Sequence, residues 1–142
     1  MNWFNRQTLL VPFDFSEESH QAIATALEMA STVTKVYVVH VAPDLTVASP
    51  EVVWQTLSEA ARRQNIETAF HKEFPTDIYR KLNLHVCFGD PGQSIAHYAE
   101  EIGAGLIVMP SHGRTGIKRL LIGSVAERVV RMAHCPVLVL RH

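Results

Sequence analysis

The sequence predicts an α/β protein: an open, five-stranded parallel sheet with helices on both faces. Short apolar runs alternate with helix-spaced segments along the whole chain, which is typical of a parallel sheet. The apolar runs are nearly continuous rather than alternating, as expected for strands buried on both faces. The 142 residues, 47% hydrophobic and 19% charged, suit a single globular domain over 1–142.

The first two strands are expected at Thr8–Phe13 and Lys35–Ala42, which are rich in apolar, β-branched and aromatic residues. Between them Ser16 is a candidate N-cap, and Glu17 and Glu18 suit a first helical turn. The apolar positions of this helix are Ala22, Ile23, Ala26, Leu27 and Ala30.

A loop is expected over Pro43–Pro50, followed by a helix from Glu51 to about His71. The apolar side of that helix is predicted to carry Val53, Leu57, Ala60 and Ala61. Trp54 packs on the core or flanks a ligand, and the sequence does not distinguish these two roles.

The second half of the chain repeats the strand–helix pattern. Strands are expected at Leu82–Phe88, at 106–109 ("LIVM") and at 137–142 ("VLVLRH"). The sharp turn at 89–92 leads into a helix that ends at 103–105. The apolar positions of this helix and of the last one are Ile95, Ala96, Ala99, Ile102, and then Val125, Ala126, Val129, Val130 and Ala133.

Open parallel sheets bind ligands outside the carboxyl ends of their strands. This rule selects four places: Asp14, Val41–Ala42, Gly89–Pro91 and Met109–Gly113. The segment from Met109 to Val130 has the most features of a ligand-binding loop, because it leads from a strand end through glycines into a helix. A phosphate could be held here by backbone N–H groups and by the positive end of the helix dipole. Gly113 and Gly123 would let the backbone approach the phosphate closely, and Ser124 would add its hydroxyl.

The local positive charge supports a phosphate site but is also compatible with another interpretation. Residues 109–131 hold five basic residues and one acidic one, Glu127, a local charge of +4 in a chain of net charge −1. The basic residues are Arg114, Lys118, Arg119, Arg128 and Arg131. The same residues also fit an ordinary helix start at Ser124 with a solvated basic face.

Several function classes are disfavoured. The net charge of −1 gives no global attraction to nucleic acid or to an anionic membrane. The chain has no apolar run near the roughly 20 residues of a membrane span and no signal-peptide pattern, so a cytoplasmic protein is expected. Neither a Walker A loop nor a Gly-x-Gly-x-x-Gly signature is present.

Reactive and metal-binding residues are also sparse. Cys87 and Cys135 have no metal-ligand spacing and are expected as free thiols. Ser111 and His112 are adjacent and lack a third partner, so no hydrolase triad is expected, and His112 is assigned to phosphate contact or to the turn. His40 is expected to be a hydrogen-bonded core residue, and no dedicated metal site is predicted.

The spacing His112-Gly113, nine residues, Gly123-Ser124 resembles the nucleotide-binding motif of the universal stress protein family. The resemblance extends to "LLVPFDFSEES", "VVHV", "GDPGQSIAHYAEE" and "CPVLVLR", and so covers the whole chain. It implies strand order 3-2-1-4-5, ATP or AMP as the ligand, and a homodimer. Independently of the resemblance, a divalent cation such as Mg²⁺ could accompany a triphosphate through its oxygens. The last strand, an apolar edge, is the expected interface: Val137, Leu138, Val139 and Leu140.

The resemblance also assigns the site. It places Asp14 and the backbone of Val41 at the adenine, and Gly113, Gly123, Ser124 and Val125 around ribose and phosphates. Asp14 would accept a hydrogen bond from the base amine, or it would only cap the first helix. The remaining candidates adjoin these positions at strand ends and turns: Pro12, Phe13, Gly89, Met109, Pro110, His112 and Arg114.

Pro110 departs from the family motif, whose first glycine falls at this position. Proline offers no N–H, so if the family's glycine donates its N–H to the ligand, one hydrogen bond of about 1 kcal/mol is lost; if the position needs positive φ, the loop must be rebuilt. We expect binding to be retained, in a stress-response regulatory protein. The alternatives are a dimerisation module that acts through protein partners without nucleotide, and a slow ATP hydrolase, for which no general base is evident.

Overall fold

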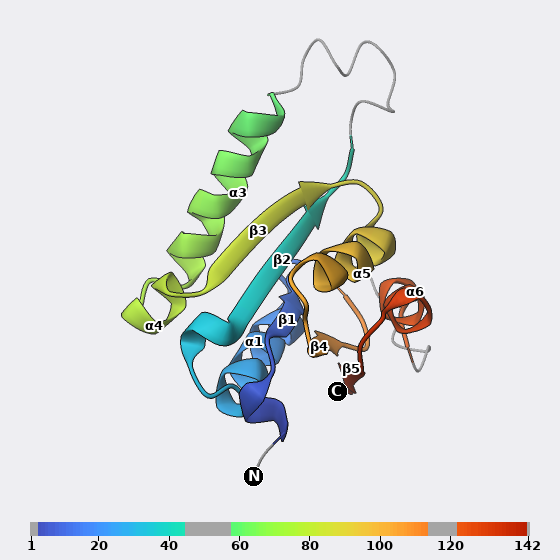
Figure 1. Ribbon diagram of the computed structural model, residues 1–142. Helices are drawn as coiled ribbons and strands as arrows, with labels where there is room; N and C mark the ends of the chain where they lie inside the picture. The colour runs from blue at the N-terminus through green and yellow to red at the C-terminus, as the bar shows by residue number, and fades with distance from the viewer. Residues whose placement is uncertain (1–2, 45–57, 114–121, 142) are drawn as a thin grey trace.

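The computed structural model describes residues 3–44, 58–113 and 122–141. Its five parallel strands lie in the order β3-β2-β1-β4-β5 (Figure 1), which confirms the predicted fold class and strand order. The strands are β1 (Leu9–Pro12), β2 (Val36–Ala42), β3 (Asn83–Phe88), β4 (Leu106–Pro110) and β5 (Val137–Leu140).

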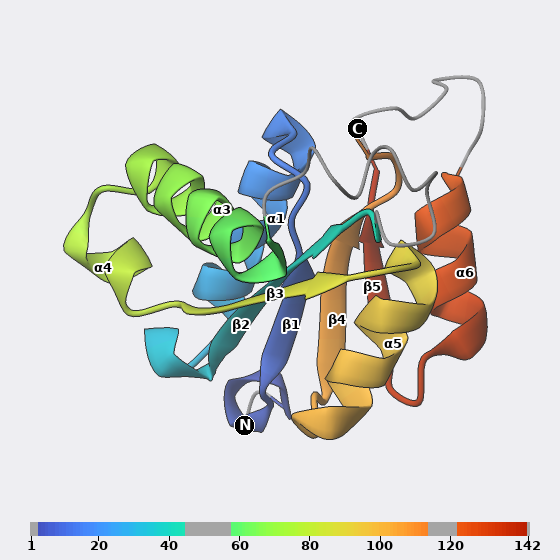
Figure 2. The ribbon, with the colours of Figure 1, turned by 90° about the horizontal axis from the view of Figure 1, so that it is seen from above.

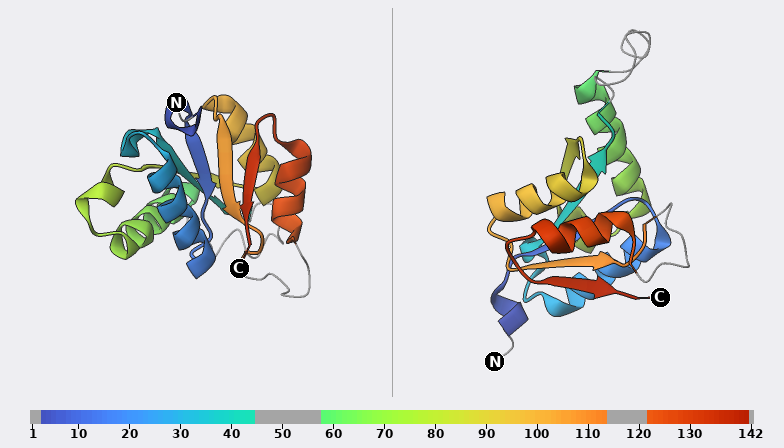
Figure 3. Two further views of the ribbon diagram at one scale, coloured as in Figure 1. Left: turned by 90° about the horizontal axis from the view of Figure 1, so that it is seen from below. Right: turned by 90° about the vertical axis from the view of Figure 1, so that its right-hand side faces the viewer.

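Helices cover both faces of the sheet. Figure 2 shows α1 (Glu17–Met29), α3 (Glu59–Glu73) and the short α4 (Asp77–Arg80) on one side, with α5 (Pro91–Glu101) and α6 (Ser124–Met132) on the other. The two further views show the same layers (Figure 3). Short 3-10 turns at Trp3–Arg6 and Val33–Lys35 precede β1 and β2. No helix of the described ranges is long and apolar enough to cross a membrane.

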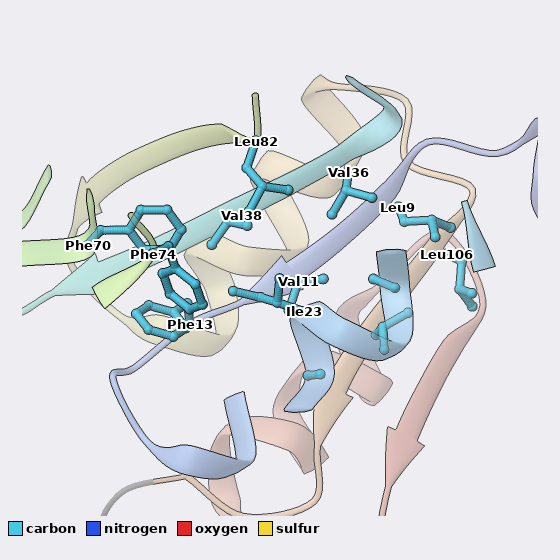
Figure 4. Packing of buried hydrophobic residues seen from close by; sticks show 13 residues of the cluster. Leu9, Val11, Phe13, Ile23, Val36, Val38, Phe70, Phe74, Leu82 and Leu106 are labelled. Carbon is cyan, nitrogen blue, oxygen red and sulfur yellow. The ribbon is translucent and has the colours of Figure 1, made fainter. Parts of the chain in front are cut away.

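The core on the α1 and α3 side is rich in aromatic rings. Phe13, Phe70 and Phe74 gather beside Val11 and Val38 (Figure 4). The Phe13 and Phe70 rings meet edge to face with centroids 5.2 Å apart, and those of Phe70 and Phe74 are 4.7 Å apart. Phe70 is completely buried, so it anchors α3 to the sheet.

The core on the other face joins the sheet to α5 and α6 through smaller residues, among them Leu10, Ile107 and Val129. Two predicted members of it were wrong: Val125 and Val130 are 38% and 49% exposed. The nine-residue α6 buries only Ala126 and Val129.

Helix ends follow local chemistry. Ser16 caps α1 as predicted, its Oγ accepting a hydrogen bond from the Ser19 N–H at 3.1 Å. Asp90 caps α5 in the same way through the Gln93 N–H at 2.9 Å. Gly103 ends α5 with φ +65°, a left-handed conformation that glycine adopts at little cost.

α3 differs from its prediction. It begins at Glu59, capped by Ser58, and ends at Glu73 rather than near His71. The expected start at Glu51, together with Val53, Trp54 and Leu57, lies outside the described residues. Ala60 was expected on the apolar side but is exposed, because α3 reaches the core through Phe70 near its other end.

Both cysteines are free thiols, as predicted. Cys87 lies in β3 and Cys135 just before β5, at opposite edges of the sheet. Burial raises the pKa of both thiols; for Cys87 a hydrogen bond with Ser94 and the charge of Arg63 partly oppose that rise.

We therefore expect two titratable thiols per chain that react slowly in the folded protein. A raised pKa leaves less thiolate at a given pH, and thiolate is the nucleophile. Iodoacetamide labelling at pH 8 should be slower for the native protein than for the urea-unfolded protein. The difference between the two labelling rates should decrease as the pH rises. Fewer than two thiols in unreduced, unfolded protein would contradict the assignment.

Candidate functional site

The carboxyl end of β1 is held tightly. The Phe13 N–H donates to the Val39 carbonyl at 2.8 Å, and the Phe13 carbonyl is 2.8 Å from Nδ1 of His40. The Phe13 ring lies in the core. Phe13 and Pro12 therefore fix the direction of the strand end, and His40 has the hydrogen-bonded role expected for it.

Asp14 follows in a tight turn. Its Oδ1 accepts hydrogen bonds from the Ser16 N–H at 3.0 Å and from the Ser16 hydroxyl at 2.5 Å. Phe15, between them, has φ +65°, an uncommon conformation for a residue with a side chain. The sequence did not single out Phe15, although an Asp side chain often accepts a hydrogen bond from the backbone N–H two residues on in such turns. Ser16, not Asp14, caps α1, which leaves Asp14 to orient the turn.

The other carboxylate oxygen of Asp14 faces the glycine after β4. A Cβ on Gly113 would lie 2.6 Å from Asp14 Oδ2, so a larger residue here would have to displace this carboxylate. β1 and β4 are neighbouring strands. The structure thus brings together the two motif positions, Asp14 and Gly113, that the resemblance assigned to opposite parts of a nucleotide.

Gly123, the N-cap residue of α6, lies in a crowded position. A Cβ there would lie 3.0 Å from the Ser111 carbonyl oxygen, and the Gly123 N–H donates to that carbonyl. Its φ is −76°, so close approach rather than backbone freedom explains the glycine. Ser124 and Val125, the first residues of α6, are exposed.

The N-terminus of α6 has no side-chain cap. By contrast, Ser16, Ser58 and Asp90 cap α1, α3 and α5, the other described helices of comparable length. The first N–H groups of a helix need acceptors, and the positive end of the dipole favours an anion there. This end of α6 is therefore suited to an external acceptor such as a phosphate.

His112 lies between Gly113 and the start of α6. Its Nδ1 is 3.2 Å from the Ser111 hydroxyl, whereas its Nε2 is buried and has no hydrogen-bond partner. Ser111 itself is 2% exposed. An unpaired buried nitrogen beside an uncapped helix is consistent with a site that a ligand completes with a hydrogen bond.

The basic residues of 109–131 contribute less free positive charge to the candidate phosphate site than their number suggests. Arg128 pairs with Asp90, with Nε and Oδ2 3.4 Å apart, and Arg131 pairs with Glu127. A Cβ on Gly92 would lie 2.8 Å from the Arg128 stem, so this arginine also joins α5 to α6. Arg114, Lys118 and Arg119 lie outside the described residues.

The remaining candidates lie at strand ends. Val41 is half-buried, and the ladder between β1 and β2 ends two residues before it, opposite Val39. Gly89, with φ +136°, makes the turn after the edge strand β3, three strand spacings or roughly 14 Å from β4. Gly89 is thus the candidate farthest from Gly113 within the sheet.

Met109 and Pro110 end β4 and are both buried. Ile107 and Ser111 donate their N–H groups to β5, so the Pro110 nitrogen faces the β1 side of the strand. The ladder with β1 ends at Ile107. Proline at this position therefore breaks no bond of the sheet.

The fold is that of a known family. The model of the universal stress protein family matches residues 5–141. The chain belongs to the universal stress protein family. Its relative "Universal stress protein MJ0531" of Methanocaldococcus jannaschii is 36% identical over 138 residues, which is 94% of this chain and 81% of the relative.

Solved structures of universal stress proteins agree. MJ0577, a universal stress protein of the same organism, is 26% identical with a TM-score of 0.73 and 97% of each chain covered. A universal stress protein solved in complex with cAMP shares the fold, with a TM-score of 0.65, 21% identity, and 94% of this chain and 96% of that chain covered.

Proposed function

We propose that this universal stress protein is a regulatory protein of the stress response that binds an adenine nucleotide, ATP or AMP, at the carboxyl ends of β1 and β4. The proposal rests on the region where the end of β1, the residues after β4 and the start of α6 meet, called the corner below. There the Asp14 carboxylate lies against Gly113, and the N-terminus of α6 has no side-chain cap. A relative in this family that was solved with cAMP supports a nucleotide as the ligand class.

Each part of the corner matches a part of the ligand. The Asp14 carboxylate would accept a hydrogen bond from the adenine amine, and the Val41 backbone lies beyond the end of the β1 ladder. The α6 N-terminus and the Ser124 hydroxyl would hold phosphate oxygens. Mg²⁺, when bound through the phosphate oxygens, would neutralise part of the triphosphate charge.

Replacing Gly123 with valine should weaken ATP binding at least tenfold. The new side chain would crowd the Ser111 carbonyl at the point where phosphates approach α6. Gly103→Ala is the matched control. It strains a glycine with φ +65° before β4, at the opposite end of the strands, where a Cβ would have no neighbour within 4 Å.

Isothermal titration calorimetry with ATP and AMP measures the difference. Wild-type affinity in Gly103→Ala with a loss in Gly123→Val supports the site. Equal affinity in Gly123→Val and the wild type would show that the nucleotide binds elsewhere, and no binding to the wild type would reject the proposal.

We further propose that two copies assemble through β5. β5 is an edge strand with Leu138 36% exposed, and it carries no charge between Val137 and Leu140. Such an edge is normally paired or covered. A second copy related by a two-fold axis would pair with it in an antiparallel, self-complementary way.

A further inference from the structure

A side chain, that of His40, replaces a backbone donor at the carboxyl end of the β1–β2 ladder. The last backbone bond there runs from the Phe13 N–H to the Val39 carbonyl at 2.8 Å. The next bond of a parallel ladder would join the Val41 N–H to the Phe13 carbonyl. That carbonyl lies instead 2.8 Å from Nδ1 of His40, so the ladder ends at this side chain.

The replacement determines where two donors point. A carbonyl oxygen only accepts, so Nδ1 of His40 carries a proton and donates it. Backbone groups of successive strand residues point to opposite sides: Val39 bonds to β1, whereas Ala42 accepts from the Gly89 N–H on the β3 side. The Val41 N–H therefore points to the β1 side, one step beyond the last bond of the ladder.

The same side chain holds the backbone on which Asp14 sits. The carbonyl of the Phe13–Asp14 peptide is bound by His40, and the N–H of that peptide is 3.4 Å from the hydroxyl of the buried Ser19 in α1. The His40 ring also packs against the ring of Phe15, the residue with φ +65°, with centroids 5.2 Å apart. His40 thus supports the chain on both sides of Asp14.

The ends of β1 and β2 consequently offer one acceptor and one donor, the Asp14 carboxylate and the Val41 N–H. A 6-aminopurine presents the complementary pair, because its ring N1 accepts and its amine donates. A 6-oxopurine presents the reverse pair, since its N1–H donates and its O6 accepts. Such a ligand would leave polar groups of the site unpaired, which is the strongest basis for rejecting a base of the same shape.

We infer that His40 is the positioning residue for recognition of the base: by binding the Phe13 carbonyl it presents the Val41 N–H and the Asp14 carboxylate together, and the site therefore selects 6-aminopurines over 6-oxopurines. His40 acts through the backbone rather than by contact with the ligand. The inference rests on the proposed function and deepens it, because it names the class of base and the residue that determines its selection.

The first test compares ATP with inosine triphosphate, which has an oxygen in place of the 6-amino group, by calorimetry. The wild type should bind ATP at least about tenfold more tightly. His40→Phe keeps a ring against Phe15 but removes the donor, so ATP should bind about three- to tenfold more weakly while the affinity for inosine triphosphate changes less than about twofold. His40→Asn, which places an N–H near the position of Nδ1, should recover part of the selectivity.

A general loss of structure in His40→Phe would weaken both nucleotides equally, whereas the positioning role changes their ratio. Equal losses for the two nucleotides, or an unchanged ratio, would overturn the inference and leave the proposed function standing.

The second test is amide hydrogen exchange of the ligand-free protein, followed by NMR. In His40→Phe the Phe13 carbonyl becomes available to the Val41 N–H, so the ladder should extend and the Val41 amide should exchange more slowly than in the wild type. In the wild type, addition of ATP should slow the same amide. Equal exchange of Val41 in the wild type and in His40→Phe would overturn the inference.

His85→Phe is the matched control. His85 is a half-buried histidine of the neighbouring strand β3, but its ring stacks on Tyr98 of α5 at 4.1 Å, on the other face of the sheet. This variant should leave both the nucleotide ratio and the exchange of Val41 unchanged. Equal affinity of the wild type for the two nucleotides would reject selection by His40 but not nucleotide binding, and binding of neither nucleotide would reject both.

Discussion

Replacing Val139 with proline is expected to abolish the proposed β5 dimer and to leave a folded monomer. The carbonyls of Pro136 and Leu140 accept hydrogen bonds from β4, so the even-numbered residues of this strand face β4. Backbone groups of successive strand residues point to opposite sides, and the Val139 N–H therefore points to the free edge. Proline would remove this outward donor and preserve the ladder with β4.

Light scattering measures the mass, and urea unfolding verifies that the monomer is folded. Val139→Thr keeps both the N–H and the β-branched shape and should remain dimeric. Leu138→Pro, which removes a donor facing β4, should destabilise the fold. A wild-type protein with the mass of one chain at micromolar concentration would contradict the β5 interface.

Replacing Phe70 with alanine is expected to lower the free energy of unfolding by about 3–5 kcal/mol. The side chain is completely buried, and its ring contacts those of Phe13 and Phe74. Its loss would leave a cavity at the junction of α3 with the sheet. Since most proteins are stable by only about 5–15 kcal/mol, the variant should be close to unfolding at 37 °C.

Urea denaturation followed by circular dichroism measures this loss. Ile78→Ala is the control, because Ile78 is a large apolar residue that is 59% exposed. It should change stability by less than about 0.5 kcal/mol. A similarly small effect of Phe70→Ala would mean that α3 is not held to the sheet by the aromatic cluster.

The sequence predicted the strands well, because a strand buried on both faces leaves a continuous apolar run. It predicted helix ends where a cap residue was visible, as at Ser16 and Gly103. Helical faces were less predictable. Val125 and Val130 have the spacing of a buried stripe, but a short helix at the edge of the sheet buries only part of it.

The site was predictable as a set of strand ends but not as a geometry. The rule for parallel sheets selected Asp14 and Gly113, yet their direct contact depends on the neighbouring positions of β1 and β4. The left-handed backbone of Phe15 arises from the Asp14–Ser16 turn. The pairing of Arg128 with Asp90 joins two helices, and no spacing along the chain shows it.

The central place of β1 in the sheet also determines which strand edge is unpaired while the chain is being translated. β1 is the first strand along the chain but the central one in space, between β2 and β4. Translation at about 5–20 residues per second delivers β4 roughly 5–20 s after β1. During that interval one edge of β1 has no neighbour, and unpaired edges are templates for association with other chains. A chain halted after β3 should therefore aggregate or require a chaperone, because of the order of its strands rather than of any single residue.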